Sequence, residues 1–183
     1  GAEAGKDLLF VKRLCAKAGV RFVGKTINVP AMAEREGKSV EHAARNARYS
    51  FLFRTARSQG CRVICTAHHS DDNAETFLLN LLRGTSARGL RGIPVKRKVS
   101  KSLHIARPLL WAGKKEILLY LESNGIKYRR DSTNEDEKYT RNWIRKTLLP
   151  LMEAKQPRFR EHLAAITEEL DGGRFGTERP CQR

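Results

Sequence analysis

One short segment, residues 66–76 with the sequence TAHHSDDNAET, concentrates the side chains that could carry out chemistry. It follows an apolar run and begins a helical pattern, so it is expected at the carboxyl edge of a strand, where open α/β sheets bind ligands. Its histidines and carboxylates are His68, His69, Asp71, Asp72 and Glu75. On a helix the three carboxylates share roughly one face. Such like charges require a cation nearby, which a ligand ammonium or a metal ion can supply.

Other interpretations of this segment remain open. Asp71 and Asp72 near a helix N-terminus are favoured by the helix dipole, and Ser70 or Asp71 can cap the helix. Capping explains neither the histidine pair nor Glu75. The spacing is not the H-E-x-x-H of a zinc hydrolase. A Mg²⁺ site holding phosphates, with Asp72 as a candidate ligand, suits the carboxylates better.

A glycine-rich loop and two basic runs come after this segment. Residues 83–94, RGTSARGLRGIP, contain three glycines that let backbone N–H groups approach an anion or a nucleic acid. No Gly-Lys-Ser/Thr follows, so this is not a Walker A loop, and a flexible surface loop is the alternative. The first basic run is Arg88, Arg91, Lys96, Arg97, Lys98 and Lys101, and the second is Arg129, Arg130, Arg141, Arg145 and Lys146. These runs predict binding to a phosphate backbone, with a strong salt dependence.

Composition supports a polyanionic partner. The 183 residues include 36 Lys+Arg and 20 Asp+Glu, a formal net charge of +16, which favours nucleic acid. No apolar stretch approaches the roughly 18 residues of a membrane span. The four cysteines form no C-x-x-C pair, which argues against a zinc ribbon or an iron–sulfur site. With no secretory signal, a reduced cytoplasmic setting is expected.

Hydrophobic periodicity predicts an α/β fold with a parallel sheet flanked by helices. Helices are expected at 7–18, 40–58 (capped by Ser39), 71–82, 113–124, 139–152 and 158–170. Strands are expected at 20–29, 61–67 and 103–111, with a polar connection at 31–38. The predicted organisation is an α/β part at 1–112, a helical C-terminal part of the same region at 113–171, and a disordered tail or linker at 172–183.

Several of these segments together resemble the motifs of a known family. The run HHSDDNAETFLLNLLRGTSARGLRGI is similar to the HHxDDxxET and LLRGxxxxGLxG patterns of the tRNA(Ile)-lysidine synthetases. Residues 39–52, 106–110 and 131–152 match further family motifs in the right order. The resemblance covers roughly residues 6–170. It implies a PP-loop, or N-type ATP pyrophosphatase, domain with an adenine-nucleotide α-hydrolase-like fold.

The resemblance also implies a reaction. ATP adenylates the C2 oxygen of the wobble cytidine in tRNA(Ile) with a CAU anticodon, releasing pyrophosphate. The ε-amine of free L-lysine then attacks C2 and displaces AMP. The implied cofactors are ATP and Mg²⁺, the partners are that tRNA and lysine, and a homodimer is a candidate assembly. A tRNA thiolase of the same group and a non-catalytic RNA-binding module are the alternatives.

Site roles follow from motif positions. Catalysis would fall to Asp72, Glu75 and Arg48, and Asp72 would also be the candidate Mg²⁺ ligand. Nucleotide or phosphate binding would fall to His68, His69, Arg83, Arg141 and Arg145. Contact with tRNA would fall to Arg88, Arg91, Lys96, Arg97 and Lys98.

The sequence departs from the family pattern at one place. The phosphate-binding loop S-G-G-x-D-S does not occur within residues 1–183. We expect it upstream, together with the first strand of the sheet, and the start without Met agrees with that expectation. The isolated chain is therefore expected not to catalyse adenylation.

Overall fold

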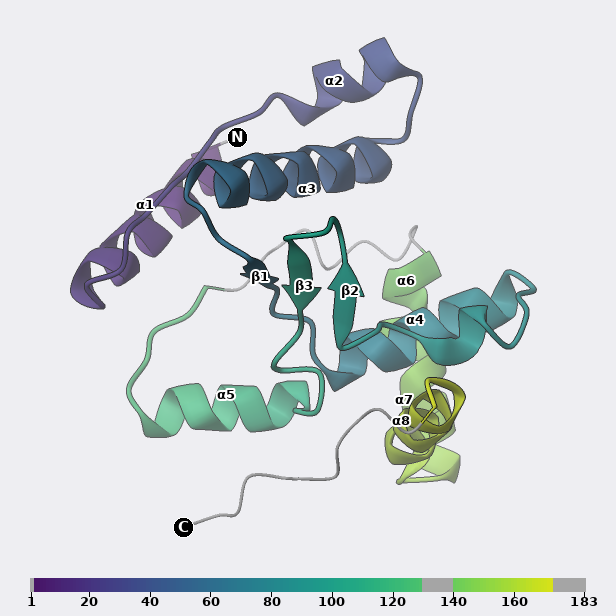
Figure 1. Ribbon diagram of the computed structural model, residues 1–183. Helices are drawn as coiled ribbons and strands as arrows, with labels where there is room; N and C mark the ends of the chain where they lie inside the picture. Colours follow the sequence, from purple (N-terminus) through teal and green to yellow (C-terminus); the bar gives the residue numbers. More distant parts are fainter. Residues whose placement is uncertain (1, 130–139, 173–183) are drawn as a thin grey trace. The chain divides into compact units, whose positions relative to one another are not determined.

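The computed structural model describes residues 2–129 and 140–172. The chain divides into two compact units, Gly1–Ile64 and Cys65–Arg183 (Figure 1). The predicted boundary between residues 112 and 113 stays a prediction. Most of the predicted tail, Arg130 of the second basic run, and the family-motif residues Asp131, Ser132 and Asn134 lie outside the described residues.

Three helices make up most of the first unit: α1 (Ala2–Lys17), α2 (Val29–Glu36) and α3 (Val40–Ser58). The expected cap of α3 is confirmed, because Ser39 Oγ accepts a hydrogen bond from His42 N at 3.3 Å. Helices α2 and α3 pack together, and Ala33, Ala43 and Ala47 are buried. Small side chains at these positions let the helices approach closely.

The strand expected at residues 20–29 is wrong, and so is the polar connection at 31–38. No strand lies between α1 and α2, and α2 occupies most of the expected connection. Asn28 caps this helix by accepting from Ala31 N at 3.3 Å, and Pro30 lies in its first turn. Proline is favoured there because its fixed φ suits the first helical turn and its missing N–H would have no partner. Pro30 thus starts a helix instead of ending a strand.

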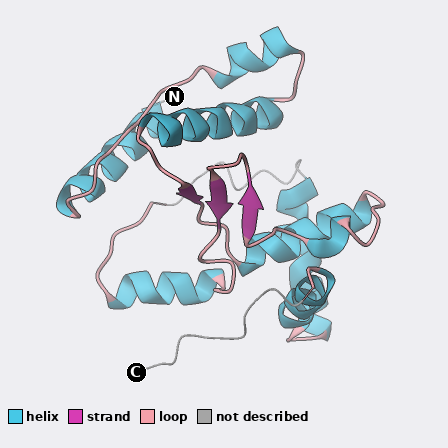
Figure 2. Ribbon diagram, in the orientation of Figure 1, coloured by secondary structure: helices cyan, strands magenta, loops and turns pink. Residues whose placement is uncertain are grey.

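A small sheet contains β1 (Val63–Cys65), β2 (Lys96–Lys98) and β3 (His104–Ala106) in the order β1-β3-β2 (Figure 2). The strands expected at 61–67 and 103–111 are present but shorter. β2 pairs antiparallel with β3, placing Arg97 opposite Ile105, which corrects the expectation of a parallel sheet here. The connection between β2 and β3 is too short for the crossover that parallel strands need. The basic run KRK is thus itself a strand, and the α/β class is confirmed.

Helices form the core of the second unit. They are α4 (Ser70–Leu82), the 3₁₀ turn η1 (Gly89–Arg91), α5 (Lys114–Ser123), α6 (Thr140–Trp143), the π-helical turn η3 (Ile144–Leu148), α7 (Leu149–Lys155) and α8 (Phe159–Leu170). The buried cluster comprises Ala74, Phe77, Leu78, Ile144, Leu149 and Leu163. Ala74, Phe77 and Leu78 confirm part of the apolar face that helical spacing predicts for α4, and they pack on helices some 70 residues later in the chain. Leu81 and Leu82, predicted on the same face, lie in the last turn of α4 and are exposed.

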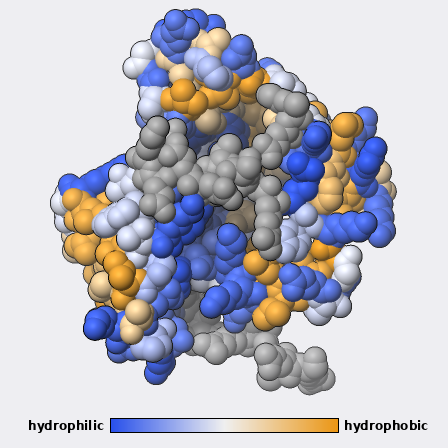
Figure 3. Space-filling view, turned by 180° about the vertical axis from the view of Figure 1, so that it is seen from behind, coloured by the Kyte–Doolittle hydropathy of each residue, from blue (hydrophilic) through white to orange (hydrophobic). Residues whose placement is uncertain are grey.

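Hydrophobic side chains also remain at the surface, where they gather in several patches between hydrophilic areas (Figure 3). Among the larger exposed ones are Trp111, Leu119, Tyr120 and Leu151. A large share of the surface of folded proteins is apolar. None of the described helices is both long enough and apolar enough to cross a membrane.

The core cluster predicts a contrast between two neighbouring leucines. Leu149 is fully buried, whereas Leu151 is 62% exposed. We expect Leu149→Ala to lower the free energy of unfolding by about 2–5 kcal/mol, because it leaves a cavity. Leu151→Ala should change it by less than about 0.5 kcal/mol. Urea unfolding followed by circular dichroism measures both, and equal effects would contradict the assigned core.

Candidate functional site

The candidate site begins where β1 leads into α4. His69 is the N-cap residue of α4, and its backbone N–H donates to Asp72 Oδ2 at 3.1 Å. Asp72 therefore caps the N-terminus of α4 through the His69 N–H, whereas Ser70 or Asp71 was expected to cap this helix. One oxygen of Asp72 is thus engaged by the helix it belongs to. His68 lies just before this turn, with its Nδ1 at 2.9 Å from Thr66 Oγ1.

Glu75 is the centre of an ion-pair cluster. Its side chain is only 1% exposed. Arg145 binds it in a bidentate manner, with Nε at 2.5 Å from Oε1 and Nη2 at 3.0 Å from Oε2. Arg141 Nε lies at 2.8 Å from Oε2, and Arg141 Nη2 also reaches Asp72 Oδ1 at 3.4 Å. Two arginines from α6 and η3 thus supply the positive charge that the α4 carboxylates require. The hydrogen bond to Glu75 raises the pKa of Arg145.

Asp71 forms a second set of contacts on the other side of the α4 start. Its Oδ1 lies 2.7 Å from Arg160 Nη1, and its Oδ2 accepts from the backbone N–H of Lys114 at 2.7 Å. Arg160 also binds Glu153 of α7, with Nε at 2.6 Å from Oε1. Asp71 therefore joins the beginnings of α4 and α5 to α8. Sequence reasoning missed Arg160, Lys114 and Glu153, because no local spacing signals contacts between residues so far apart in the chain.

The charges around Asp71 shift two pKa values in opposite directions. Partial burial acts to raise the pKa of Asp71, but the His69 ring, the Lys114 N–H and Arg160 outweigh it and hold that pKa well below its usual range. The Asp71 carboxylate, with His69 Nδ1 at 3.5 Å from its Oδ2, raises the pKa of His69 above 6.5. Burial opposes this increase, whereas Asp72 and Glu75 add to it. His69 is therefore stabilised in its protonated form.

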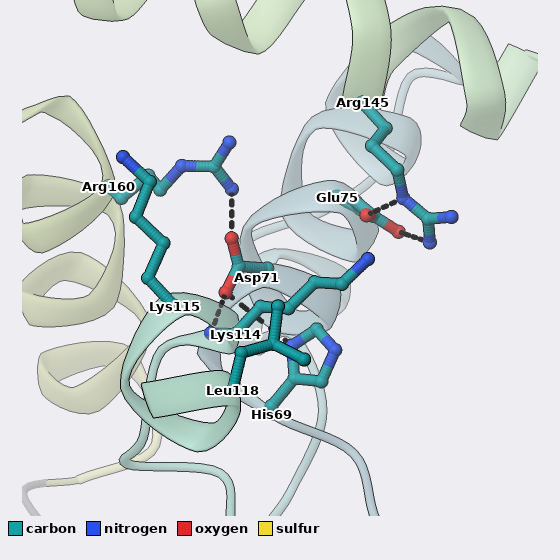
Figure 4. Close-up of a pocket in the computed structure, with 8 residues that line it drawn as sticks. All are labelled: His69, Asp71, Glu75, Lys114, Lys115, Leu118, Arg145 and Arg160. Atoms are coloured by element: carbon teal, nitrogen blue, oxygen red, sulfur yellow. Dashed lines mark hydrogen bonds and ion pairs between the residues drawn. The ribbon is translucent and has the colours of Figure 1, made fainter. Parts of the chain in front are cut away.

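These side chains line a pocket of about 380 Å³ (Figure 4). Its lining residues are His69, Asp71, Glu75, Lys114, Lys115, Leu118, Arg145 and Arg160. Four of them are lysines or arginines and two are carboxylates that already hold arginines, so the lining has a positive excess even without His69. The volume falls in the range of small-molecule sites. Such a lining is able to bind an anionic or zwitterionic group.

Other predicted site residues lie outside this pocket. Arg83 is the exposed residue that ends α4. Arg88 and Arg91 are exposed beside and within η1, and Lys96, Arg97 and Lys98 are exposed along β2. Arg48 is an exposed residue of α3 in the first unit. The structure thus brings His69, Glu75, Arg141 and Arg145 close to Asp72, and distributes the predicted tRNA-binding residues over η1 and the β2–β3 hairpin.

Comparison with known proteins assigns this chain to a family. The family model of the PP-loop domain matches residues 1–152. The chain belongs to the PP-loop domain family. Membership implies the use of ATP. The fold is similar to that of a solved structure, the U34-tRNA thiolase NcsA from Methanococcus maripaludis with its [4Fe-4S] cluster. That match has a TM-score of 0.69 and 16% identity, and covers 93% of this chain and 58% of that one.

Several curated relatives carry one name. The chain is 39% identical over 171 residues to the tRNA(Ile)-lysidine synthase of Bacteroides thetaiotaomicron, covering 93% of this chain and 39% of the relative. It is 39% identical over 172 residues to that of Porphyromonas gingivalis, covering 94% and 37%. It is 37% identical over 173 residues to that of Bacillus subtilis, covering 92% and 36%. The chain spans less than two fifths of the length of these relatives.

The carboxylates of the site do not form a ready-made Mg²⁺ site among the described residues. In the ranges 2–129 and 140–172, no group of three or more His, Cys, Asp or Glu side chains is arranged to hold a metal ion. Both oxygens of Asp72 contact protein donors, His69 N and Arg141 Nη2. The described side chains therefore do not form a Mg²⁺ site by themselves.

The buried position of Glu75 gives a direct test of the cluster. We expect Glu75→Gln to lower the free energy of unfolding by on the order of 3 kcal/mol, because two arginines then lose their shared buried carboxylate. Glu161→Gln is the matched control: Glu161 pairs with Arg158 at 2.7 Å, but both side chains are mostly exposed. Its cost should be below about 0.5 kcal/mol. Similar urea midpoints for the two variants would contradict the assignment.

The two shifted pKa values predict a pH dependence. The contribution of His69 to stability is full below its unfolded-state pKa of about 6.5 and is lost as the pH rises through its higher folded-state pKa. The contribution of Asp71 is full above about 3.9 and is lost as the pH falls through its depressed pKa. An NMR titration of the His69 ring should give a pKa above 6.5 that decreases in Asp71→Asn.

The control for this titration is His42→Gln, which alters a histidine of α3 in the first unit. It should leave the titration of His69 unchanged. A His69 pKa that is the same with and without the Asp71 carboxylate would show that their contact does not set it.

Proposed function

We propose that this chain is the PP-loop part of a tRNA(Ile)-lysidine synthase, an ATP-dependent ligase that joins free lysine to the wobble cytidine of tRNA(Ile) with a CAU anticodon. The observation that carries the proposal is the binding of Glu75 by Arg141 and Arg145 at the start of α4. Glu75 comes from the HHxDDxxET-like motif. Arg141 and Arg145 come from the family-like segment 131–152 and follow Glu75 by 66 and 70 residues. The lysidine synthases named above support the proposal, because they are 37–39% identical to this chain over more than nine tenths of its length.

The side chains suit the two chemical demands of this reaction. ATP supplies the adenylate that makes the C2 oxygen of cytidine a leaving group. The negative charge of its phosphate favours nearby guanidinium groups, and Arg141 and Arg145 are held by Glu75 at this place. The attacking amine must lose a proton, and we assign its acceptance to Asp72. The Oδ1 of Asp72 would then exchange its 3.4 Å contact with Arg141 Nη2 for the lysine amine.

Several parts of the proposal concern partners and cofactors. His68, His69 and Arg83 are proposed to contribute to nucleotide or phosphate binding, and Arg48 to catalysis. A Mg²⁺-ligand role for Asp72 stays a prediction, because both of its carboxylate oxygens contact protein donors. A homodimer and a cytoplasmic location remain predictions.

The tRNA is proposed to contact the exposed basic residues of η1 and the β2–β3 hairpin. The net charge of +16 supports a polyanionic partner. Arg88 and Arg91 lie at η1. Lys96, Arg97 and Lys98 form β2, and the side chains of all three are exposed. Such contacts to phosphates give an affinity that falls steeply with salt.

A thiolase is less well supported. The fold neighbour is a U34-tRNA thiolase with a [4Fe-4S] cluster, but at 16% identity it supports only the fold. Clusters of that kind are held by cysteine thiolates, and this sequence contains no C-x-x-C pair. A non-catalytic RNA-binding module would leave the carboxylate–arginine cluster of α4 without a chemical role.

Asp72 tests the proposed reaction. In the protein that the complete gene encodes, Asp72→Asn should reduce incorporation of radiolabelled lysine into tRNA(Ile) by at least about 100-fold, because general-base catalysis contributes about that much or more. Affinity for the tRNA, measured by filter binding, should stay within about twofold.

The matched control is Asp171→Asn, at the end of α8. It should retain lysine incorporation. If Asp72→Asn kept full activity, the assignment of Asp72 would be wrong. If the unaltered protein incorporated no lysine into this tRNA while remaining folded, the proposed function itself would fail.

A further inference from the structure

We infer that Asn73 is a positioning residue, which fixes the loop of residues 83–94 against α4 and α8 and so presents Arg88 and Arg91 to RNA in one arrangement. This inference rests on the proposed RNA-binding role of the loop. It concerns a residue with no catalytic part in the proposed reaction. Asn73 lies on α4 between Asp72 and the core-facing Ala74.

Both ends of the Asn73 amide are used. The side chain is buried, with 5% exposed. Its Oδ1 accepts from the backbone N–H of Ile93 at 2.7 Å, and its Nδ2 donates to Thr167 Oγ1 at 3.0 Å. Thr167 is buried too, and its hydroxyl donates onward to Ala164 O at 2.8 Å. A buried polar network in which every member has its partner specifies one arrangement.

The chemistry of the partners fixes the orientation of the amide. The Ile93 N–H can only donate, so it must face the Asn73 oxygen. The Thr167 hydroxyl proton is directed to Ala164 O, so the hydroxyl oxygen is left to accept from the Asn73 nitrogen. Aspartate has nearly the same shape as asparagine, but its carboxylate has no proton to give to Thr167. Only an amide satisfies both neighbours.

Gly92 shows how closely the loop approaches Asn73. It has a φ of +66°, a conformation that favours glycine. A Cβ atom added there would lie 2.2 Å from Asn73 Oδ1 and 3.3 Å from Thr167 Cγ2. The backbone of the loop therefore reaches the amide at a point where a side chain does not fit.

A second asparagine of α4 holds the same loop. Asn80 Nδ2 donates to Gly89 O at 2.8 Å. Asn80 follows Asn73 by seven residues, or about two helical turns, so both side chains lie on one side of α4. Between these attachment points, Leu90 packs against the buried cluster of the second unit. η1 contacts both α4 and α8.

The consequence concerns the charged residues of the loop. Leu90 faces the core, whereas its neighbours Arg88 and Arg91 are exposed. A loop held at Gly89 and Ile93 has little freedom to turn these arginines away. Preorganised side chains bind more tightly because less conformational entropy is lost on binding.

The experiment compares Asn73→Asp with the double variant R88Q/R91Q and with both changes combined. Binding to a synthetic anticodon stem-loop with a CAU anticodon is measured by fluorescence anisotropy over a series of salt concentrations. NMR hydrogen exchange of the Ile93 amide reports the docking of the loop. Asn124→Asp, at the exposed end of α5, controls for the added negative charge.

If Asn73 positions the arginines, R88Q/R91Q weakens RNA binding about tenfold and lowers the salt slope by roughly 1.5 to 2, as for two lost phosphate contacts. Asn73→Asp weakens it by a similar factor and accelerates Ile93 exchange at least about tenfold. The combined variant is then no more than about twofold weaker than R88Q/R91Q, because both changes act on the same contacts. Asn124→Asp stays within about twofold of the unaltered chain.

A milder pair of variants covers the case in which Asn73→Asp does not fold. Thr167→Val removes the hydroxyl that Asn73 donates to, and Thr167→Ser keeps it. Only Thr167→Val should accelerate Ile93 exchange and weaken RNA binding.

Unchanged Ile93 exchange in Asn73→Asp and Thr167→Val would overturn the inference, and so would losses in affinity that multiply in the combined variant. If R88Q/R91Q bound RNA normally, the RNA-binding role of the loop would fail, and this inference with it. The lysine incorporation assay would then still decide the proposed reaction separately.

Discussion

A buried carboxylate is the constraint on which the second unit depends. Glu75 is almost fully enclosed and would be very costly as a lone charge. Arg141 and Arg145 remove that cost only when α6 and η3 lie against α4. The ion pair therefore links local folding to long-range packing: the helices that bury Ile144 and Leu149 also deliver the two guanidinium groups. Removing only one partner of such a buried ion pair lowers the free energy of unfolding far more than replacing all partners with apolar residues.

The same ion pairs give the acidic segment 66–76 a structural role within the chain. Three carboxylates near one helix start suggest an open binding site for a cation, and the structure shows that the chain provides the cations itself. Asp71 is held by Arg160, Asp72 by His69 N and Arg141, and Glu75 by two arginines. The pocket beside them consequently has a positive excess, which is compatible with a phosphate or a carboxylate.

Local signals predicted the elements that carry the site. The apolar spacing of Ala74, Phe77 and Leu78 identified α4 and its buried face, and Ser39 identified the start of α3. The β-branched residues between 20 and 29 were misleading, because Asn28 and Pro30 fit a helix start equally well. Motif similarity brought Arg141 and Arg145 into the candidate site. No such signal existed for Arg160 or Lys114, whose contacts with Asp71 arise only from the packing of α5 and α8.

The π-helical turn at Ile144–Leu148 has a consequence for the two faces of this part of the chain. Leu149 N donates to Ile144 O, five residues earlier, and both side chains are fully buried. In a regular α-helix these residues would lie about 140° apart around the axis. One wider turn brings them into phase while Arg141 and Arg145, four residues apart, keep facing Glu75. The wider turn therefore allows the two arginines to face Glu75 while Ile144 and Leu149 both face the core. Deleting one residue from this turn would restore a regular helix, in which one of these two sets of contacts would be lost.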